Sequence, residues 1–206
     1  MNDSSQALGS GSGNQAARTK RAAAVDYVLR PASNRPIAAN RAAAAALRRL
    51  SELRCLNKRL DAAYAGAVVL QLLFESPWLA SCTLSFTAEA AYDDDGSCYR
   101  SISVNVQDIE AAEGADFPTH TFNEGVFNED EAVAWVEGQV ETEAAALYSA
   151  FHSADSYEDI SLQGCRTAVA DLLEQLSATG RASGLAAFGA LWPQSTHWIR
   201  QDHQPV

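Results

Sequence analysis

The residues with the clearest capacity for chemistry are three consecutive aspartates followed by a glycine, at positions 93–96. Carboxylate-rich loops can bind Ca²⁺, but an EF-hand loop needs alternating acidic ligands before its glycine and a glutamate six residues after it. Ala91 and Ile102 occupy the first and last of these ligand positions, so an EF-hand is not expected. Asp and Gly are also the residues that tight turns favour, and the sequence predicts a turn here.

The histidines and cysteines form no recognisable site. His197, Asp202 and His203 could ligate a metal, but a polar C-terminal tail is the simpler interpretation. His120 and His152 are isolated residues interpreted as structural or exposed. The four cysteines contain no Cys-x-x-Cys pair and are expected to be free thiols: Cys55, Cys82, Cys98 and Cys165. Nucleophile-elbow, zinc-protease, P-loop and dinucleotide-binding motifs are absent from the sequence. We therefore expect no metal and no cofactor.

Charge is distributed unevenly along the chain, which carries a net charge of −11 at pH 7. Residues 1–60 contain eleven Lys and Arg residues against three acidic ones, whereas residues 61–206 contain four Arg residues against 23 Asp and Glu. This asymmetry indicates a basic segment attached to an acidic body. Solubility alone would explain an acidic body equally well, because net charge does not report on the fold.

The acidic body provides the first candidate binding surface. Its carboxylates are concentrated in one predicted helix and in the aspartate-rich turn: Glu129, Asp130, Glu131, Glu137 and Glu141, with Asp93, Asp94 and Asp95. Like charges at i and i+4, such as Glu137 and Glu141, cost a helix roughly a few tenths of a kcal/mol, which hints at a function. Closely spaced carboxylates can also imitate the phosphates of a duplex, about one charge per 1.7 Å of axis. From these residues we predict that the protein docks on a basic protein surface. The simpler interpretation is that they form a solvated helix face with no partner.

The basic segment 41–59 provides the second candidate surface, with these binding residues: Arg48, Arg49, Arg54, Lys58 and Arg59. It could contact nucleic acid or an acidic partner, or fold back and neutralise the acidic body of its own chain. No helix-turn-helix or RNA-binding motif accompanies the charge, so sequence-specific readout is not expected. Leu47, Leu50 and Leu53 also permit this helix to pack against a copy of itself, which makes a homodimer a further hypothesis.

A β-hairpin, at about residues 82–108, is expected to position the aspartates. Apolar and polar residues alternate on both sides of the turn. A three-residue loop at 94–96 places the apolar residues of both strands on one face, whereas a slip of one residue would not. The predicted cross-strand pairs are Tyr92 with Cys98, Ala88 with Ile102, Phe86 with Val104, and Leu84 with Val106.

Helical spacing predicts three helices, at about 41–75, 129–152 and 161–178. Asn40 and Asn128 are suited to begin the first two, and Gly180 is suited to end the third. An apolar stripe on the first helix predicts that its second half is buried against the hairpin: Leu53, Leu56, Leu60, Ala63 or Tyr64, Ala67, Leu70 and Phe74. Residues 117–122 are expected to form a short third strand at a sheet edge, because they contain Pro118.

These elements together predict an α+β domain at 41–206, in which a small antiparallel sheet packs against three helices. The Gly-Ser-rich residues 1–40 are expected to be a disordered arm, and the stretch from about residue 181 is expected to be an irregular tail or a short helix. No secretory signal is expected because residues 1–15 are polar, and the longest apolar run, 62–74, is shorter than the roughly 20 residues that span a bilayer. Its preference for Arg over Lys and its abundant Ala are typical of GC-rich genomes. We therefore expect a cytoplasmic, bacterial protein with no membrane partner.

Three classes of function follow from the sequence. The leading class is a non-enzymatic acidic binding protein, such as an inhibitor, immunity or accessory factor, that docks electrostatically on a basic surface, with nucleic-acid mimicry as one means of docking. The alternative is a regulator that associates with nucleic acid through residues 41–59. The third is an enzyme with an unfamiliar site, which would be marked by a cleft of converging titratable residues.

Overall fold

The computed structural model describes residues 27–28, 37–38, 40–153 and 155–196. The chain divides into two compact units, residues 1–50 and 51–206, which are described separately. In the first unit, β1 (Tyr27–Val28) pairs with β2 (Ile37–Ala38) as an antiparallel ladder. The rest of the predicted disordered arm, up to residue 39, lies outside the described residues.

Helix α1 (Arg41–Glu75) begins in the first unit and continues into the second. Its start is the predicted one, since the Asn40 side-chain oxygen accepts a hydrogen bond from the Ala43 amide at 2.9 Å. None of the helices in the described part of the chain has the length and hydropathy that crossing a bilayer requires.

The second unit is built on an antiparallel sheet with the strand order β4-β3-β5. Strands β3 (Leu79–Tyr92) and β4 (Cys98–Ala111) form the predicted hairpin, and all four predicted cross-strand pairs are present. The hairpin closes through a hydrogen bond of 3.0 Å from the Asp93 amide to the Ser97 carbonyl, and Gly96 adopts a φ of 77°. The predicted turn is therefore confirmed, and the four cysteines are free thiols, as predicted.

The third strand is β5 (Ile160–Cys165), which pairs with β3. The predicted strand at 117–122 is wrong, because these residues form turns that bury the Phe122 ring. The predicted helix at 161–178 is wrong over its first residues, since Leu162 and Gly164 are buried and alternate with exposed Ser161 and Gln163. The short 3-10 turn η3 (Thr167–Val169) follows, and the helix itself, α4 (Ala170–Thr179), ends at Gly180 as predicted.

The predicted helix at 129–152 is divided into three parts: α2 (Glu129–Val140), the 3-10 turn η2 (Glu141–Glu143) and α3 (Ala144–Ser149). Asn128 caps α2 as predicted, accepting from the Glu131 amide at 3.2 Å. The short 3-10 segment η1 (Asn123–Gly125) precedes it. After α4, the expected irregular tail contains helix α5 (Gly184–Leu191) and the 3-10 turn η4 (Pro193–Thr196).

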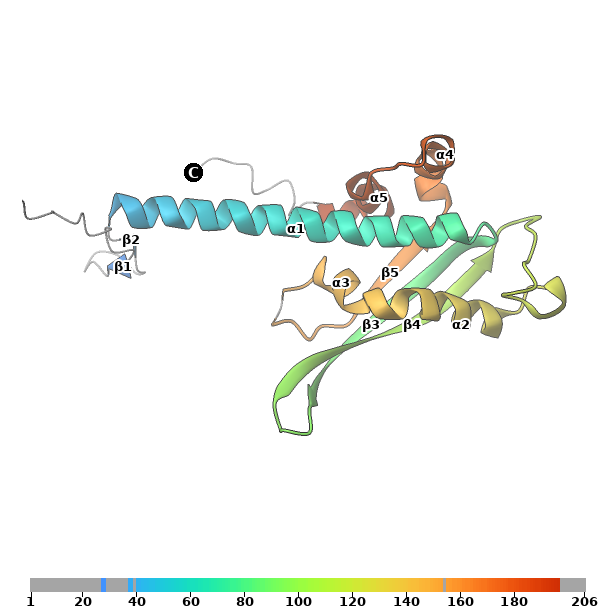
Figure 1. The fold of residues 1–206 in the computed structure, drawn as a ribbon, viewed down its shortest axis with the longest axis horizontal. Coiled ribbons are helices and arrows are strands. Elements are labelled where there is room, and N and C mark those ends of the chain that lie inside the picture. Colours follow the sequence, from blue (N-terminus) through green and yellow to red (C-terminus); the bar gives the residue numbers. More distant parts are fainter. Residues whose placement is uncertain (1–26, 29–36, 39, 154, 197–206) are drawn as a thin grey trace, which may run out of the picture. The chain divides into compact units, whose positions relative to one another are not determined.

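The helices cover one face of the sheet (Figure 1). Residues on β3 alternate between buried and partly exposed, with Leu84, Phe86 and Ala88 facing the helices. Val69 of α1 lies over Gly164 of β5, so closely that a Cβ added at Gly164 would lie 3.3 Å from the Val69 methyl carbon. Helices α2 and α3 pack over β4. The predicted α+β class with a one-sided sheet is confirmed.

The face that α1 buries is not the predicted one. Its core residues are Ala62, Ala65, Val69, Leu70, Leu72 and Leu73. Leu70 is the one large residue of the predicted stripe that is buried; the others are exposed: Leu53 by 55%, Leu56 by 53%, Leu60 by 60%, Tyr64 by 48% and Phe74 by 43%. Part of this face has small residues, Ala62, Ala65 and Gly66, because a second helix approaches α1 very closely at Gly66.

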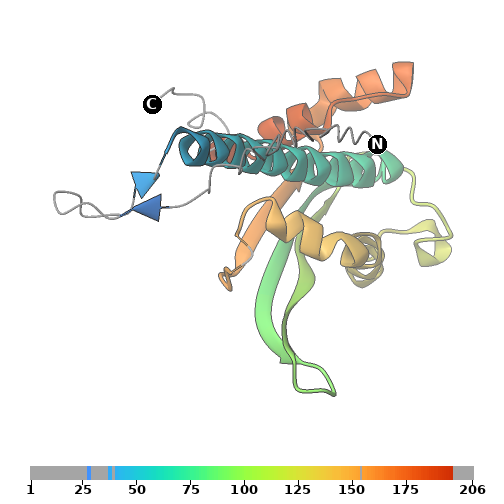
Figure 2. The ribbon, with the colours of Figure 1, turned by 60° about the vertical axis from the view of Figure 1, so that its left-hand side comes forward.

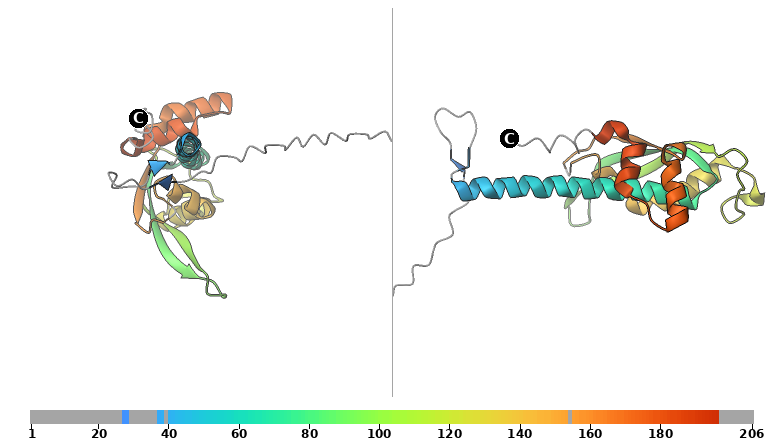
Figure 3. Two further views of the ribbon diagram at one scale, coloured as in Figure 1. Left: turned by 90° about the vertical axis from the view of Figure 1, so that its left-hand side faces the viewer. Right: turned by 90° about the horizontal axis from the view of Figure 1, so that it is seen from above.

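That second helix is α5, which crosses α1 at a contact between two glycines (Figure 3). A Cβ at Gly66 would collide with the Gly184 carbonyl and lie 2.5 Å from the Phe188 amide nitrogen. A Cβ at Gly184 would collide with the Ala63 carbonyl and lie 2.9 Å from the Ala67 Cβ. The backbones of the two helices therefore touch, and no larger residue fits at either position.

The C-terminal end of α1 is capped by a side chain from the end of β5. The Arg166 guanidinium donates to the carbonyls of Leu73 and Ser76, the latter at 2.7 Å, and to the Leu79 carbonyl at 2.9 Å. Burial lowers the pKa of Arg166, yet an arginine stays charged at neutral pH. Its positive charge also lies at the negative end of the α1 dipole.

We predict that Gly66→Ala lowers the free energy of unfolding by at least about 2 kcal/mol, because the added methyl group separates α1 from α5. Chemical denaturation monitored by circular dichroism measures the change. Gly138→Ala is the matched control: it lies within α2 with open space around its Cβ position, and should raise stability by about 0.5–1 kcal/mol. Equal effects of the two substitutions would contradict the close crossing.

We predict that Arg166→Met lowers the free energy of unfolding by roughly 2–4 kcal/mol, because buried carbonyls lose a charged donor. The same substitution at the exposed Arg181 should change stability by less than about 0.5 kcal/mol. If both variants unfold at the wild-type denaturant concentration, Arg166 does not hold these segments together.

Candidate functional site

The second unit contains a groove of about 1130 Å³. One wall is the exposed side of α1, including Leu53, Arg54, Asn57, Lys58 and Asp61. The other wall is formed by Arg100 of β4 and by the end of α3 with the loop that follows it, including Ser149, Ala150, Phe151, His152, Ser153 and Asp155. The groove thus combines apolar side chains with charges of both signs.

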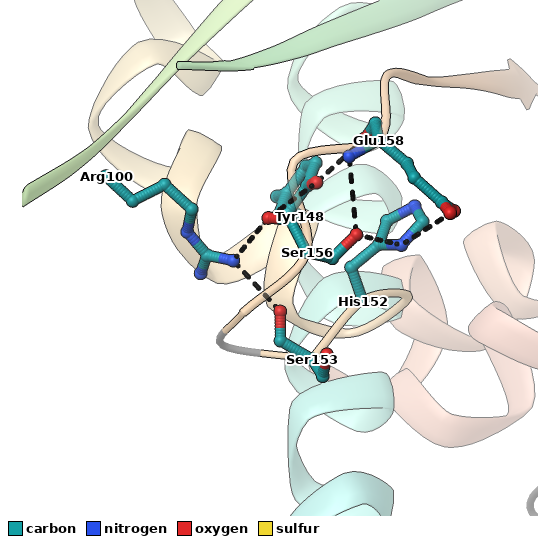
Figure 4. A network of polar contacts seen from close by, with 6 residues as sticks. All are labelled: Arg100, Tyr148, His152, Ser153, Ser156 and Glu158. Atoms are coloured by element: carbon teal, nitrogen blue, oxygen red, sulfur yellow. Dashed lines mark hydrogen bonds and ion pairs between the residues drawn. The ribbon is translucent and has the colours of Figure 1, made fainter. Parts of the chain in front are cut away.

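Arg100 holds the loop after α3 in place (Figure 4). Its guanidinium donates to the carbonyls of Ser153 at 2.9 Å and Ser156 at 3.1 Å. The same guanidinium lies 5.1 Å from the centre of the Tyr148 ring, in a cation–π contact. Two of its donors are thereby committed to the protein's own backbone, so Arg100 acts here as a structural clamp.

The same loop brings a serine, a histidine and a glutamate together (Figure 4). His152 Nδ1 lies 3.1 Å from Ser156 Oγ and 3.9 Å from Glu158 Oε2. In a catalytic triad the acid and the nucleophile contact opposite nitrogens of the imidazole, so that one orients the ring while the other loses its proton. Here both contact Nδ1, and this arrangement does not support nucleophilic catalysis.

Further contacts give this cluster a structural role. The Tyr148 hydroxyl donates to the Glu158 carbonyl at 2.7 Å, and its ring stacks on His152 with centroids 4.9 Å apart. The cluster therefore fixes the chain between α3 and β5. Sequence reasoning left His152 as an isolated residue and did not find Arg100 or Tyr148, because no local pattern joins β4 to a loop some fifty residues later.

Three of the predicted acidic binding residues have structural roles. Glu131 accepts a hydrogen bond from the Asn123 amide at 2.9 Å, and Glu137 accepts one from the Val106 amide at 3.0 Å. Asp93 accepts from the amides of Asp95 at 3.1 Å and Ser97 at 2.7 Å, which closes the hairpin turn. The repulsion between the like charges of Glu137 and Glu141 is therefore offset, because Glu137 accepts a hydrogen bond from an amide of the edge strand β4.

The other predicted acidic residues are exposed but lie in two separate places. Glu129 and Asp130 begin α2, and Glu141 lies just beyond its end. Asp94 and Asp95 lie at the tip of the hairpin, which extends past the helices (Figure 2). The fold does not join the α2 carboxylates and the hairpin carboxylates into one surface.

The predicted basic residues are all exposed on α1. Arg48 and Arg49 belong to the first unit. In the second unit, Arg54 and Lys58 line the groove. Arg54 and Arg59 form no ion pair with the carboxylates that the structure describes, so the predicted neutralisation within one chain is not observed for them.

A smaller hollow of about 230 Å³ lies between α1 and α2. Tyr64, Ala67 and Gln71 line it from α1, together with Glu75 and with Glu143 of η2. The Tyr64 hydroxyl donates to the Glu143 carboxylate at 2.6 Å. This hydrogen bond, with desolvation and the negative charge of Glu143, raises the pKa of Tyr64.

Two thiols differ sharply in their surroundings. Burial raises the pKa of the Cys82 thiol to about 12, which makes it inert at neutral pH. Cys165 Sγ lies 3.0 Å from the Thr167 hydroxyl, and this hydrogen bond, aided by backbone amides, lowers the pKa of Cys165. Cys165 has no His or carboxylate hydrogen bond in the described structure, so no acid–base partner accompanies this thiol there.

No group of three or more His, Cys, Asp and Glu residues that could hold a metal ion occurs among the described residues. The considered ligands His197, Asp202 and His203 lie outside them. Comparison of the chain with protein-family models, with curated proteins and with solved structures gave no significant match.

We predict that Thr167→Val shifts the pH profile of Cys165 alkylation to higher pH, because the thiolate loses a hydrogen-bond donor. Labelling with iodoacetamide over a range of pH, read by mass spectrometry of the peptides, measures the midpoint. Exposed Cys98 serves as the internal control, with the same profile in both proteins. An unchanged Cys165 profile would show that Thr167 does not stabilise its thiolate.

Proposed function

We propose that this protein is a non-enzymatic binding protein, an inhibitor, immunity or accessory factor, whose acidic body docks electrostatically on a basic surface of another protein. The observation that carries this proposal is that few of the described carboxylates are paired with a described cation. Between described residues there is one ion pair, from His152 to Glu158 at 3.9 Å. Most carboxylates therefore keep their charge available to a partner.

Helix α2 offers the best-placed carboxylates. Its buried residues Ala132, Val136 and Val140 face the sheet. Glu129 and Asp130 are exposed at one end, and Glu141 is exposed at the other, about 18 Å away at the helical rise of 1.5 Å per residue. Neither end forms an ion pair with the described cations.

This spacing favours a basic protein surface over close imitation of nucleic acid. A duplex carries about one charge per 1.7 Å of axis, whereas α2 presents three free carboxylates over about 18 Å. Salt-sensitive docking on the scattered Lys and Arg residues of a protein does not require so high a charge density.

The two alternatives have less support. The groove does contain converging titratable residues, but Ser156 and Glu158 contact the same nitrogen of His152, which argues against an enzyme of the triad type. Nucleic-acid binding through α1 is supported by the exposed cations Arg54 and Arg59. It is weakened because no aromatic residue lies between them on which a base could stack.

We predict that partners captured from a bacterial lysate on the immobilised protein elute as the salt concentration rises, because exposed charges are screened over about 10 Å at 0.1 M ionic strength. The double variant Glu129→Gln and Asp130→Asn should release them at lower salt. The readout is the salt concentration at which each captured protein elutes.

The matched control is Asp171→Asn with Glu174→Gln, which removes the same charge from the exposed side of α4 and should leave elution unchanged. Capture that resists high salt, or equal effects of the two double variants, would contradict docking through α2. Retention of duplex DNA by the wild type, and its loss on substituting Arg54 and Arg59 by Gln, would favour the nucleic-acid alternative instead.

A further inference from the structure

One edge of the hairpin has no partner strand over part of its length. Strand β5 begins at Ile160, which pairs with Phe86, so β3 continues through residues 87–92 beyond the start of β5. In the described part of the chain, no other strand pairs with this stretch on that side. Figure 2 shows the hairpin continuing past β5 and past the helices. We call residues 87–92 the free edge, which is about 20 Å long at the strand rise of about 3.3 Å per residue.

The backbone groups of the free edge are placed to pair with an added strand. In an antiparallel ladder, the amides and carbonyls of alternate residues point toward opposite neighbours. The Asp93 amide donates to the Ser97 carbonyl on the β4 side, whereas the Ala80 carbonyl accepts from the Arg166 amide on the β5 side. Odd-numbered residues of β3 therefore face β4, and even-numbered residues face the side of β5. The outward-facing residues of the free edge are Ala88, Ala90 and Tyr92.

The two faces of the free edge differ in polarity. The core face of β3 continues past the helices with Ala90, which is exposed, and with Tyr92, which exposes 70% of its surface. On the opposite, open face, Thr87 and Glu89 alternate with these residues. Successive side chains of an added strand would lie beside one face and then the other. The free edge therefore suits an extended segment in which apolar and polar residues alternate.

The charges around the free edge are mostly negative. The hairpin contains one cation, Arg100, and its guanidinium is already held by two backbone carbonyls and by the Tyr148 ring. The groove cations Arg54 and Lys58 belong to α1, on the other wall of that groove. The carboxylates lie on the edge, in the turn at its end and just before β5: Glu89, Asp93, Asp94, Asp95, Glu158 and Asp159. The same edge of a second copy would be repelled here, whereas a basic strand would be attracted.

We propose that an extended basic segment of a partner protein binds the free edge as an added strand, antiparallel to β3 and in line with β5. Its backbone pairs with Ala88, Ala90 and Tyr92. Its basic side chains lie on the open face beside Glu89, and its apolar side chains lie beside Ala90 and Tyr92. This strand addition rests on the proposed function for one point, the basic character of the partner.

Amide hydrogen exchange followed by NMR tests the pairing. The probe is an octapeptide in which lysine alternates with valine, blocked at both ends and added to the full chain at low salt. At saturation, exchange should slow at least about tenfold at Ala88, Ala90 and Tyr92, because these amides acquire acceptors. Exchange at Ala91, whose amide faces β4, should stay unchanged. A peptide that does not bind, or that binds without protecting the three amides, would overturn the proposal.

Methylated peptides separate strand addition from attraction between charges. In the antiparallel arrangement, the valine amides of the peptide face β3 and the lysine amides face solvent. N-methylation of the valine amides should weaken binding at least about tenfold, since the charge is kept but the donors are lost. N-methylation of the lysine amides should leave the affinity close to that of the unmodified peptide. Equal affinities of the two methylated peptides would overturn strand addition, and the reverse order would overturn the antiparallel arrangement.

A pair of variants tests the edge from the side of the protein. Ala90→Pro removes one outward amide and should weaken the unmodified peptide at least about tenfold. Ala90→Thr keeps the amide and should bind as the wild type does. Circular dichroism establishes that both variants are folded, and the methylated peptides test the wild type independently. Equal affinities of the two folded variants would contradict pairing at Ala90.

Partners captured from a lysate keep strand addition apart from docking through α2. If they elute with rising salt and Ala90→Pro releases them at the wild-type salt concentration, charge-driven docking stands and strand addition is wrong. If the peptide protects the three amides of the free edge while captured proteins resist high salt, the free edge stands as a peptide-binding site and the proposed electrostatic docking is wrong.

Discussion

The Arg166 guanidinium joins three parts of the chain that are distant in sequence: the end of α1, the start of β3 and the end of β5. The last carbonyls of a helix have no partner within the helix, and burying them without donors is costly. One arginine supplies those donors, and its charge suits the negative end of the helix dipole. This contact fixes the start of the sheet against the end of α1, and β3 and β5 both extend from it.

Helix α1 has large apolar residues on two sides. Leu70, Leu72 and Leu73 fill the core, as in a usual amphipathic helix. The buried side is also narrow where Gly66 meets Gly184 of α5, because the two backbones touch there. Leu60, Tyr64 and Phe74 lie on the exposed side.

The acidic residues are likewise of two kinds. Glu131 and Glu137 accept backbone hydrogen bonds, and Asp93 closes a turn, so their charges are part of how the fold satisfies its own amides. Glu129, Asp130 and Glu141 accept no such hydrogen bond in the described structure, and the proposed docking relies on them.

Local sequence determined the hairpin register, because alternation and the glycine at position 96 leave one arrangement with both apolar faces aligned. It also determined the starts of α1 and α2, since an asparagine cap acts within one turn. Tertiary structure alone decided that 160–165 is a strand, because pairing with β3 outweighs the helical spacing of a short segment. It also decided which side of α1 is buried: the stripe of large residues looked like a core, and the sequence holds no local sign that α5 packs on Gly66. The groove depends on Arg100 reaching a distant loop, so no spacing rule could have located it.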